Sequence, residues 1–450
     1  MISTRLSSVL LGAACFLACC PLLGGEPSAR RGYEFLTTQA LVPPDFPEAI
    51  FDEVWTMWPE PLRSEAEKTT PEERRKLAFT RYGLTPRPND PTKPLQYVVG
   101  EDGEWTMNCF ACHGGQVGGK VIPGLPNSNY ALQTLVEETR ALKLAKQAPY
   151  GRMDLGSAFV PLGSTNGSTN AVMFGVVLMN FRDADLKWHD NRRPPKLVNH
   201  DMDAPPWWHF KRKRFMYIDG FASKSHRGLS QFAMVRANGP EKFREWEDSF
   251  RDVYAYLSSI ESPQYPYEID QQLARTGEAI FNNNCAECHG TYGEKSEYPE
   301  RIVPIDEVGT DRVRLDALSA ANRRSYGESW FNYHGKLRTR ENPGGYVAPP
   351  LDGVWASAPY FHNGSVPTLW HVLNSAERPG VWRRSAEGYD QQQVGLEIKT
   401  YKAVNRDAPL AERREYFDTG AFGKSAGGHT FPDRLSRDEK WAVLEYLKTL

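Results

Sequence analysis

The sequence contains Cys109-Phe110-Ala111-Cys112-His113 and, later, Cys285-Ala286-Glu287-Cys288-His289, two copies of the pattern Cys-x-x-Cys-His. They hold every cysteine outside the first 25 residues. Two thiols one helical turn apart can each form a thioether with a haem vinyl group, and the adjacent histidine can then bind the iron. The pattern predicts two covalently bound haem c groups. Their predicted attachment sites are Cys109, Cys112, Cys285 and Cys288, and their proximal ligands are His113 and His289.

Cys-x-x-Cys also occurs in zinc sites and in thioredoxin-type redox centres. A zinc site prefers a second ligand pair nearby, whereas these two copies lie far apart in the sequence. A thioredoxin site belongs to a compact βαβ unit, and no such pattern surrounds either copy. The spacing therefore favours haem over zinc or dithiol chemistry.

Residues 1–25 have the composition of a secretory signal peptide. Arg5 precedes an apolar run from Val9 to Leu23, which is short for a membrane span. Phe16-Leu17-Ala18-Cys19 loosely resembles a lipoprotein cleavage site, and simple cleavage near Gly25 is the alternative. We expect an exported, periplasmic protein with no transmembrane span and, in the lipoprotein case, a lipid anchor. Export agrees with the haem prediction, because c-type haem is attached outside the cytoplasmic membrane.

Composition narrows the class of protein. The formal net charge of −2 implies no nucleic-acid partner. The 450 residues are enough for two or three domains, and 33 Pro with 37 Gly indicate a loop-rich chain. We predict a mainly α fold with two cytochrome c-like haem domains and long ordered loops.

Helix signals suggest where the domains divide. A capping box at Thr70-Pro71-Glu72-Glu73 predicts a helix that Gly83 terminates. Apolar residues at steps of three and four predict another helix from about Pro240 to Ile260. The proline-bearing segment 262–266 follows and is interpreted as a linker. The predicted units are an N-terminal haem c domain with extensions at 26–262 and a C-terminal cytochrome c domain at 267–450.

The second unit begins and ends with matching helices. An apolar pattern that includes Gly277 and Phe281 predicts a helix leading into Cys285. A capping box at Ser436-Arg437-Asp438-Glu439 begins the last helix. In cytochrome c domains the first and last helices pack together, so we expect these two to be in contact.

The sixth iron ligand of the C-terminal haem must come from a histidine. The last methionine, Met234, precedes the second motif, so this domain has no methionine ligand of its own. His429 follows Gly427 and Gly428, which allow the backbone to approach a haem face. His362 lies in a turn with aromatic flanks. We choose His429 first and His362 second; for each, the alternative is a loop histidine bonded to backbone or water.

The sixth ligand of the N-terminal haem is left open. Its motif runs into the glycine-rich segment 114–119, which suits close backbone packing. The aromatic run 205–210 could wall a haem and the basic residues 211–214 could pair with propionates; a packed corner beside a solvated turn is equally consistent. His226, with no spacing to support it, is selected as a sixth ligand or distal acid–base group.

The chain resembles the dihaem bacterial cytochrome c peroxidase superfamily. The resemblance rests on the two motifs at this separation, on Gly428-His429 before the last helix, and on the run Ala358-Pro359-Tyr360-Phe361-His362-Asn363-Gly364-Ser365-Val366-Pro367-Thr368-Leu369. It is strongest over residues 205–450 and around the first motif, and weak before residue 90. The branch that looks closest is the rubber-oxygenase-like dihaem cytochromes. The methylamine-dehydrogenase maturation enzyme belongs to the same superfamily.

The resemblance implies two haem domains packed face to face, of which one relays electrons and the other meets peroxide or dioxygen. His113 and His289 match the proximal ligands. In the rubber-oxygenase branch the C-terminal haem has two histidines, whereas conventional peroxidases use a methionine, from which this chain departs. Trp208 and Phe221 are suggested as aromatic residues of the reactive pocket. The resemblance also allows a Ca²⁺ ion between the domains.

Three functions stay open: a redox enzyme, a plain dihaem electron carrier, and a haem-based sensor or assembly subunit. Length favours the enzyme, because a carrier needs little more than about 100 residues per haem domain. We predict an oxidoreductase with the N-terminal haem as the peroxide- or dioxygen-reactive site and the C-terminal haem as the electron-transfer site. The expected partner is a small redox protein or a periplasmic dehydrogenase. The main alternative is a non-catalytic carrier for such a dehydrogenase.

Overall fold

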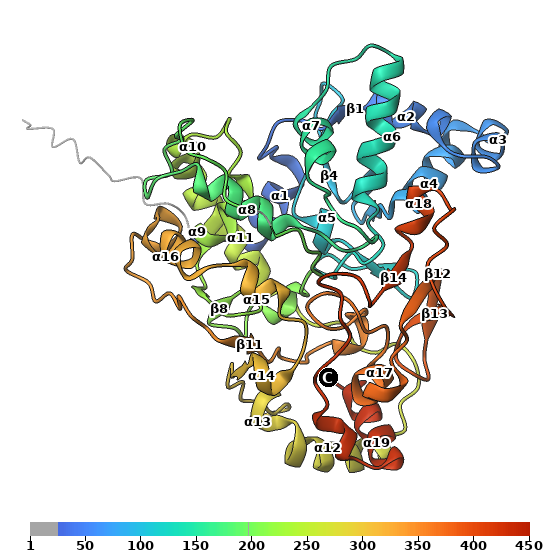
Figure 1. Cartoon of the computed structure of the whole chain (residues 1–450), viewed down its shortest axis with the longest axis vertical. Helices are drawn as coiled ribbons and strands as arrows, with labels where there is room; N and C mark the ends of the chain where they lie inside the picture. Colours follow the sequence, from blue (N-terminus) through green and yellow to red (C-terminus); the bar gives the residue numbers. More distant parts are fainter. Residues whose placement is uncertain (1–25, 197) are drawn as a thin grey trace, which may run out of the picture.

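The computed structural model describes residues 26–196 and 198–450. The predicted signal peptide and lipoprotein-like site lie outside the described residues. About 41% of the chain is helical, with several small sheets (Figure 1), so helices dominate as expected. No helix within the described ranges is long and apolar enough to cross a membrane.

The N-terminal layer joins helices to a small antiparallel sheet. It contains α4 (Pro71–Tyr82) and α6 (Leu132–Ala145). Its sheet has the order β1-β5-β4, with bounds Phe46–Pro47, Glu104–Met107 and Tyr97–Val99. Phe51 stacks on Trp105 at 4.4 Å between ring centroids and helps to close the core beneath the sheet. This layer leads directly into the first haem motif.

The predicted capping box of α4 is confirmed. The Thr70 hydroxyl accepts a hydrogen bond from the Glu73 N–H, and the Glu73 carboxylate accepts one from the Thr70 N–H. Gly83 ends the helix with φ +64°, a left-handed conformation that glycine adopts without strain.

The helix predicted from Pro240 to Ile260 is two helices. α10 (Pro240–Glu245) and α11 (Glu247–Ser259) meet at Trp246, whose φ and ψ are −84° and 0°. α11 packs on α1 (Ala29–Thr38). The same hydrophobic core takes in Trp330 and Phe331, so residues beyond the expected linker pack onto the N-terminal half. The domain boundary itself stays a prediction.

The expected contact between first and last helices of the C-terminal unit is confirmed. α12 (Gln271–Asn284) packs along α19 (Arg437–Leu447), and both lie together at the bottom of Figure 1. A Cβ added at Gly277 would lie 1.8 Å from the Ala442 carbonyl oxygen, so glycine permits this close approach. The Ser436–Glu439 capping box is also present.

An antiparallel sheet on the right of Figure 1 was not expected from the sequence. Its order is β13-β12-β14, with bounds Gly395–Tyr401, Val381–Asp390 and Tyr416–Asp418. Trp382 stacks on Phe417 at 5.1 Å between ring centroids. β12 carries consecutive arginines rather than a regular polar–apolar alternation, which hid it from pattern reading.

After the second motif, three short helices lie in the chain between two paired antiparallel strands. β10 (Ile302–Pro304) pairs with β11 (Gly345–Val347), and α14 (Ile305–Val308) and α15 (Val313–Ala317) follow β10 in the chain. α16 spans Ala320–Glu328. The remaining helices are α2 (Glu48–Glu53), α3 (Leu62–Glu67), α5 (Phe110–His113), α7 (Arg152–Phe159), α8 (Ala171–Asn180), α9 (His226–Leu229), α13 (Ala286–His289), α17 (Leu369–Leu373) and α18 (Leu410–Arg413). The remaining strands are β2 (Pro86–Arg87), β3 (Asp90–Pro94), β6 (Gln116–Val117), β7 (Lys120–Val121), β8 (Phe215–Met216) and β9 (Ala222–Ser223).

Candidate haem sites

Each motif folds as one short helical turn, α5 in the first copy and α13 in the second. The four cysteines carry free thiols. Burial raises the pKa of both Cys109 and Cys285 to about 11, whereas a thioredoxin-type cysteine has a lowered pKa. In the part of the chain that the structure describes, no three His, Cys, Asp or Glu side chains gather as a metal cage. The surroundings suit thioether attachment better than a zinc or dithiol centre.

At the second motif the structure brings His289 and His429 together. Their ring centroids are 6.1 Å apart, with the ring planes inclined by 70°. His289 Nδ1 donates to the Pro349 carbonyl at 2.9 Å, which leaves Nε2 for a metal. Two metal–nitrogen bonds of about 2 Å, end to end between imidazoles, put the ring centres about 6 Å apart. The pair therefore fits a haem iron held from both sides.

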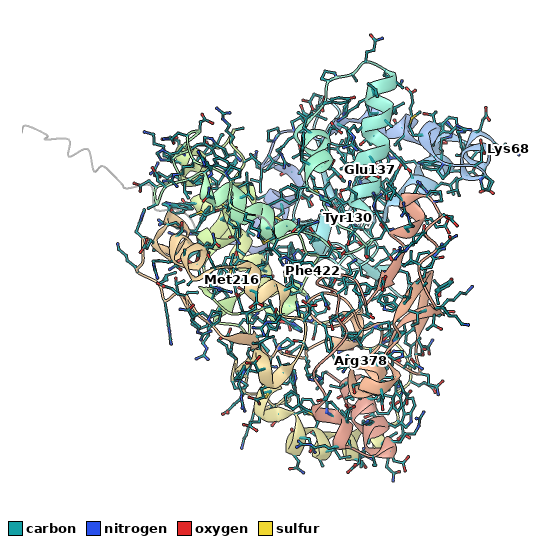
Figure 2. The ribbon with its side chains drawn as sticks, viewed as in Figure 1. Lys68, Tyr130, Glu137, Met216, Arg378 and Phe422 are labelled. Atoms are coloured by element: carbon teal, nitrogen blue, oxygen red, sulfur yellow. The ribbon has the colours of Figure 1, made fainter. Side chains whose placement is uncertain are left out.

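The loop that carries His429 is fixed by its backbone. The His429 N–H donates to the Val308 carbonyl at 2.6 Å, and a Cβ at Gly428 would lie 2.2 Å from the Gly309 carbonyl carbon. Arg378, labelled in Figure 2, donates to the carbonyls of Ala426 and Gly428 at 2.7 Å each. These contacts hold His429 at φ +47°, a left-handed conformation unusual for a histidine.

The protonation of His429 also suits a ligand. Burial, and then the positive charges of His289 and Arg378, lower the pKa of His429 to about 3. The imidazole is neutral at pH 7, so a nitrogen lone pair is available. Its Nδ1 is buried and has no hydrogen-bond partner among the described residues.

His362, the second choice for this ligand, lies elsewhere. Its ring packs on Tyr346, with 4.6 Å between centroids. Burial, followed by the charges of Arg314 and His200, lowers its pKa to about 3. The histidine paired with His289 is therefore His429. His362 packs in a separate cluster with Tyr346.

At the first motif, His113 has a tryptophan beside it. The His113 ring stacks on Trp207 at 4.8 Å between centroids, with 27° between planes. Its Nδ1 is buried and unbonded to any described residue. Burial lowers the His113 pKa to about 4 against the opposing effect of the Pro205 carbonyl, so the ring is neutral at pH 7. The neutral ring, with a nitrogen lone pair available, suits an iron ligand.

The glycine-rich segment after the first motif packs as closely as the sequence suggested. A Cβ at Gly115 would lie 2.2 Å from the Pro126 carbonyl oxygen. Gly118 and Gly119, with φ of +55° and +72°, make the turn between β6 and β7. The backbone is thus held tightly against the loop that follows.

A cavity of about 920 Å³ is lined by residues of α4, by Asp203 and by Arg384. Asp203 lines this cavity, and its negative charge is close enough to raise the pKa of the Cys112 thiol, after the larger effect of burial. Burial also raises the pKa of Asp203 well above its ordinary value, against the pull of Arg384. Other wall residues come from α4 and from the strands β12 and β14. Sequence reading missed Asp203 and Arg384, because no local pattern relates two residues so far apart.

The three residues chosen for the reactive pocket lie in different places. His226 has both ring nitrogens engaged, Nε2 with Glu247 at 3.3 Å and Nδ1 with the Tyr333 hydroxyl at 3.1 Å. Phe221 is buried and stacks on Tyr217 at 4.6 Å between ring centroids. Trp208 is fully buried, and its Nε1 donates to the Asp352 carbonyl at 2.6 Å. The structure does not gather them into one cluster, and their catalytic role stays a prediction.

The basic quartet is held mainly by acidic residues. Arg212 donates to both Asp352 carboxylate oxygens at 3.0 Å, and Arg214 Nε donates to Glu300 at 3.0 Å. Lys211 pairs with Glu261. These partners fit a structural corner that joins the two halves of the chain.

Adjacent tryptophans connect the two motif regions. Trp207 lies on His113, and Trp208 is bonded to the Asp352 carbonyl. The next residue back, Leu351, donates its N–H to the Tyr292 hydroxyl at 2.6 Å, and that hydroxyl donates to the His289 carbonyl at 3.0 Å. One ring stack, followed by covalent and hydrogen bonds, therefore connects one motif histidine to the other.

Known proteins are similar to parts of this chain. Residues 345–383 match the family described as RoxA-like, cytochrome c-like. Two proteins of Sinorhizobium fredii (strain NBRC 101917 / NGR234), both described as uncharacterized, also match. The protein y4iM is 34% identical over 235 residues, covering 44% of this chain and 53% of that protein. The protein y4iJ is 28% identical over 260 residues, covering 43% and 42%. The chain spans about half the length of these curated relatives.

A solved structure, of a MauG-like protein associated with microbial copper homeostasis, is similar at 17% identity with a TM-score of 0.24. The similarity covers 62% of this chain and 89% of that chain. The family match is the informative comparison, since it includes the run 358–369 that carried the sequence resemblance. Over residues 345–383 it indicates a cytochrome c-like segment, and covalently bound haem c is the cofactor that such a segment implies.

Proposed function

We propose that the protein is an exported dihaem c-type cytochrome of the rubber-oxygenase-like branch and acts as an oxidoreductase. One haem, on Cys109, Cys112 and His113, reacts with peroxide or dioxygen. The other, on Cys285 and Cys288 with His289 and His429 as axial ligands, stores and transfers electrons. A periplasmic dehydrogenase or small redox protein is the proposed partner.

The observation that carries this proposal is the difference between the two motif histidines. His289 has a second imidazole 6.1 Å away, centroid to centroid, whereas the aromatic neighbour of His113 is Trp207. When bound, haem supplies a redox-active iron, and the axial ligands decide whether that iron carries electrons or meets a small molecule. Two histidines favour electron transfer at the second site. The first site, where no imidazole of the described residues is paired with His113, is the one that we assign to the small oxidant.

The cavity that Asp203 lines supports access to the first site, because Asp203 acts electrostatically on Cys112. It is large enough for peroxide or dioxygen to approach from solvent, and Asp203 lies in its wall. Burial raises the pKa of this carboxyl well above its ordinary value, which favours the protonated form, and that form can donate a hydrogen bond. The chain thus offers a proton donor near the haem-attachment edge.

A second candidate function is a dihaem electron carrier. The bonded connection through Trp207 and Trp208, together with the His289–His429 pair, is also what a carrier would need. The two functions differ in one property, which is whether either iron is open to a ligand.

Absorption and EPR spectra of the purified full chain, recorded with and without hydrogen peroxide, test the proposal. We expect one low-spin and one high-spin iron, of which the high-spin signal changes with peroxide. Two low-spin irons that peroxide leaves unchanged would sink the enzyme and support the carrier. A protein purified from an exporting host without covalent haem would overturn both.

A further inference from the structure

Arg314, in α15, is buried with its charge unsatisfied. Its side chain is 1% exposed, and Nε, Nη1 and Nη2 all lack a hydrogen-bond partner among the described residues. The guanidinium has five N–H donors, and leaving such donors buried and unpaired is costly. The carboxylate oxygen paired with it, Asp219 Oδ2, is 3.6 Å from Nη1, beyond hydrogen-bond distance.

Asp219 is already neutralised by another arginine. Arg323 donates to the same Oδ2 from Nε at 3.1 Å and from Nη2 at 2.9 Å, and its side chain is 4% exposed. Two buried guanidinium groups therefore share one buried carboxylate. Among the described residues, one positive charge is left without a carboxylate of its own within 4 Å.

Arg182 is a second buried arginine, and its hydrogen bonds differ from those of Arg314. Arg182 is also 1% exposed, and its two Nη atoms donate to four backbone carbonyls. The acceptors are those of Leu186, Met234, Val235 and Asn238. Arg314 has no such set, so its donors are directed at a partner that is not part of the polypeptide.

The residues around Arg314 make the rest of an anion site. His200 donates from Nδ1 to the Val198 carbonyl at 2.9 Å, and its Nε2 is buried without a partner in the described chain. The charge of Arg314 acts, after burial, to lower the pKa of His200 and of His362, so both imidazoles lie within electrostatic range of the guanidinium. Tyr346 closes one side, with its hydroxyl occupied by the Leu315 N–H and the Asp311 carbonyl.

This cluster lies between the two haem motifs. On one side, the His362 carbonyl accepts from the N–H of Asp203, the residue beside Cys112. On the other side, Val308 of α14 accepts from the N–H of His429. Figure 1 draws α15 at a height between α5 and α13, the two motif helices.

We infer that Arg314, with His200 beside it, binds a carboxylate of one of the two haem groups. The planar guanidinium fork matches the two oxygens of a carboxylate. A site this enclosed has to be filled as the chain folds, and a covalently attached cofactor with two carboxylates is delivered at that stage. The inference rests on the proposed function only in requiring haem.

Three variants of the holoprotein test it: R314Q removes the charge, R314K keeps the charge without the fork, and R312Q is the matched control. Arg312 lies two residues earlier, has a 59% exposed side chain and pairs with Asp316. The readouts are haem content per chain, the midpoint potential of each haem, and the resonance Raman bands of the haem carboxylates.

R314Q should lower the midpoint potential of one haem, because a nearby positive charge disfavours the oxidised iron. It should also shift that haem's carboxylate band. In R314K the midpoint potential should fall less than in R314Q, because the positive charge is kept, but the carboxylate band should still shift. R312Q should match the unsubstituted protein in both measurements. The low-spin and high-spin haems have distinct spectra. The haem whose midpoint potential changes is therefore the one whose carboxylate binds Arg314.

Unchanged potentials and carboxylate bands in R314K and R314Q, or in R314K alone where R314Q does not accumulate, would overturn the inference. So would an unfolding midpoint that rises with chloride concentration in the unsubstituted protein but not in R314K, since a small inorganic anion would then fill the site. A chain that carries no haem at all would instead defeat the proposed function.

Discussion

The ligand set of the C-terminal haem depends on single residues with unusual backbone conformations. His429 is held at φ +47° by the Val308 carbonyl, and the preceding Gly428 has φ +77°. Without these two left-handed residues the loop could not present an imidazole 6.1 Å from that of His289. The sequence pointed to His429 through its glycines, but not to α14 as the element that fixes it.

Replacing His429 by alanine should convert the C-terminal haem from low-spin to high-spin, because one axial nitrogen is lost. Absorption and EPR spectra measure this directly. The matched control is H362A, which removes a histidine equally buried but placed against Tyr346, and it should leave the low-spin signal intact. An unchanged spectrum in H429A together with a changed one in H362A would reverse the ligand assignment.

We expect the free energy of unfolding to fall as the pH rises from about 4 to 6, because of the buried carboxyl of Asp45. Burial raises its pKa to about 6, partly opposed by Arg152 and Lys143, compared with 3.8 unfolded. The folded state therefore holds its proton more tightly, and that advantage is lost between about pH 4 and pH 6. A two-unit difference corresponds to roughly 3 kcal/mol of unfolding free energy. Denaturant titrations from pH 4 to 7 should show this decline in the unsubstituted protein and not in D45N; parallel profiles would contradict the raised pKa.

Among the elements, the pair α12 and α19 shows what a sequence can and cannot specify. Capping boxes and apolar stripes predict both helices, because these are local signals of one or two turns. The contact at Gly277 depends on which residue of α19 lies opposite, which no local pattern contains. The same limit explains the undetected break at Trp246, where the apolar stripe of α10 continues into α11.

G277A should destabilise the fold by about 1–3 kcal/mol, because the added methyl group meets the Ala442 carbonyl oxygen at 1.8 Å and forces the helices apart. G156A is the control, since Gly156 lies inside α7 and a Cβ added there would have no atom within 4 Å. That change should stabilise by about 0.5–1 kcal/mol through helix propensity. Unfolding followed by far-UV circular dichroism measures both, and equal effects would refute the packing argument.

At the scale of the whole molecule, the functional sites are assembled from distant parts of the chain. The two Cys-x-x-Cys-His motifs could be recognised from the sequence, because haem attachment requires a fixed local spacing. Asp203 with Arg384, and Arg314 with His200, were not, because each pair is joined only by folding. The interlocked core that includes Phe331 beside Phe243 has the same origin.

Trp207 and Trp208, which lie between the two motif histidines, lead to a prediction about electron transfer between the haems. If the two haems exchange electrons, the His113–Trp207 stack and the Trp208–Asp352 hydrogen bond lie on a connection between the motif histidines. W207L replaces the indole with an apolar side chain and should slow transfer severalfold. Stopped-flow reduction of the low-spin haem, followed at the wavelengths of the high-spin haem, measures the rate.

The matched control is W188L, which removes a tryptophan stacked on Phe181 at 5.0 Å between centroids, outside this connection. Midpoint potentials of both haems must be measured in each variant, because a changed driving force would also alter the rate. A rate in W207L equal to that in W188L, at unchanged potentials, would exclude Trp207 from the route. Electron transfer would then have to occur directly between the haem edges. The residues to substitute next would be Arg314 and His362, whose cluster lies between the motifs.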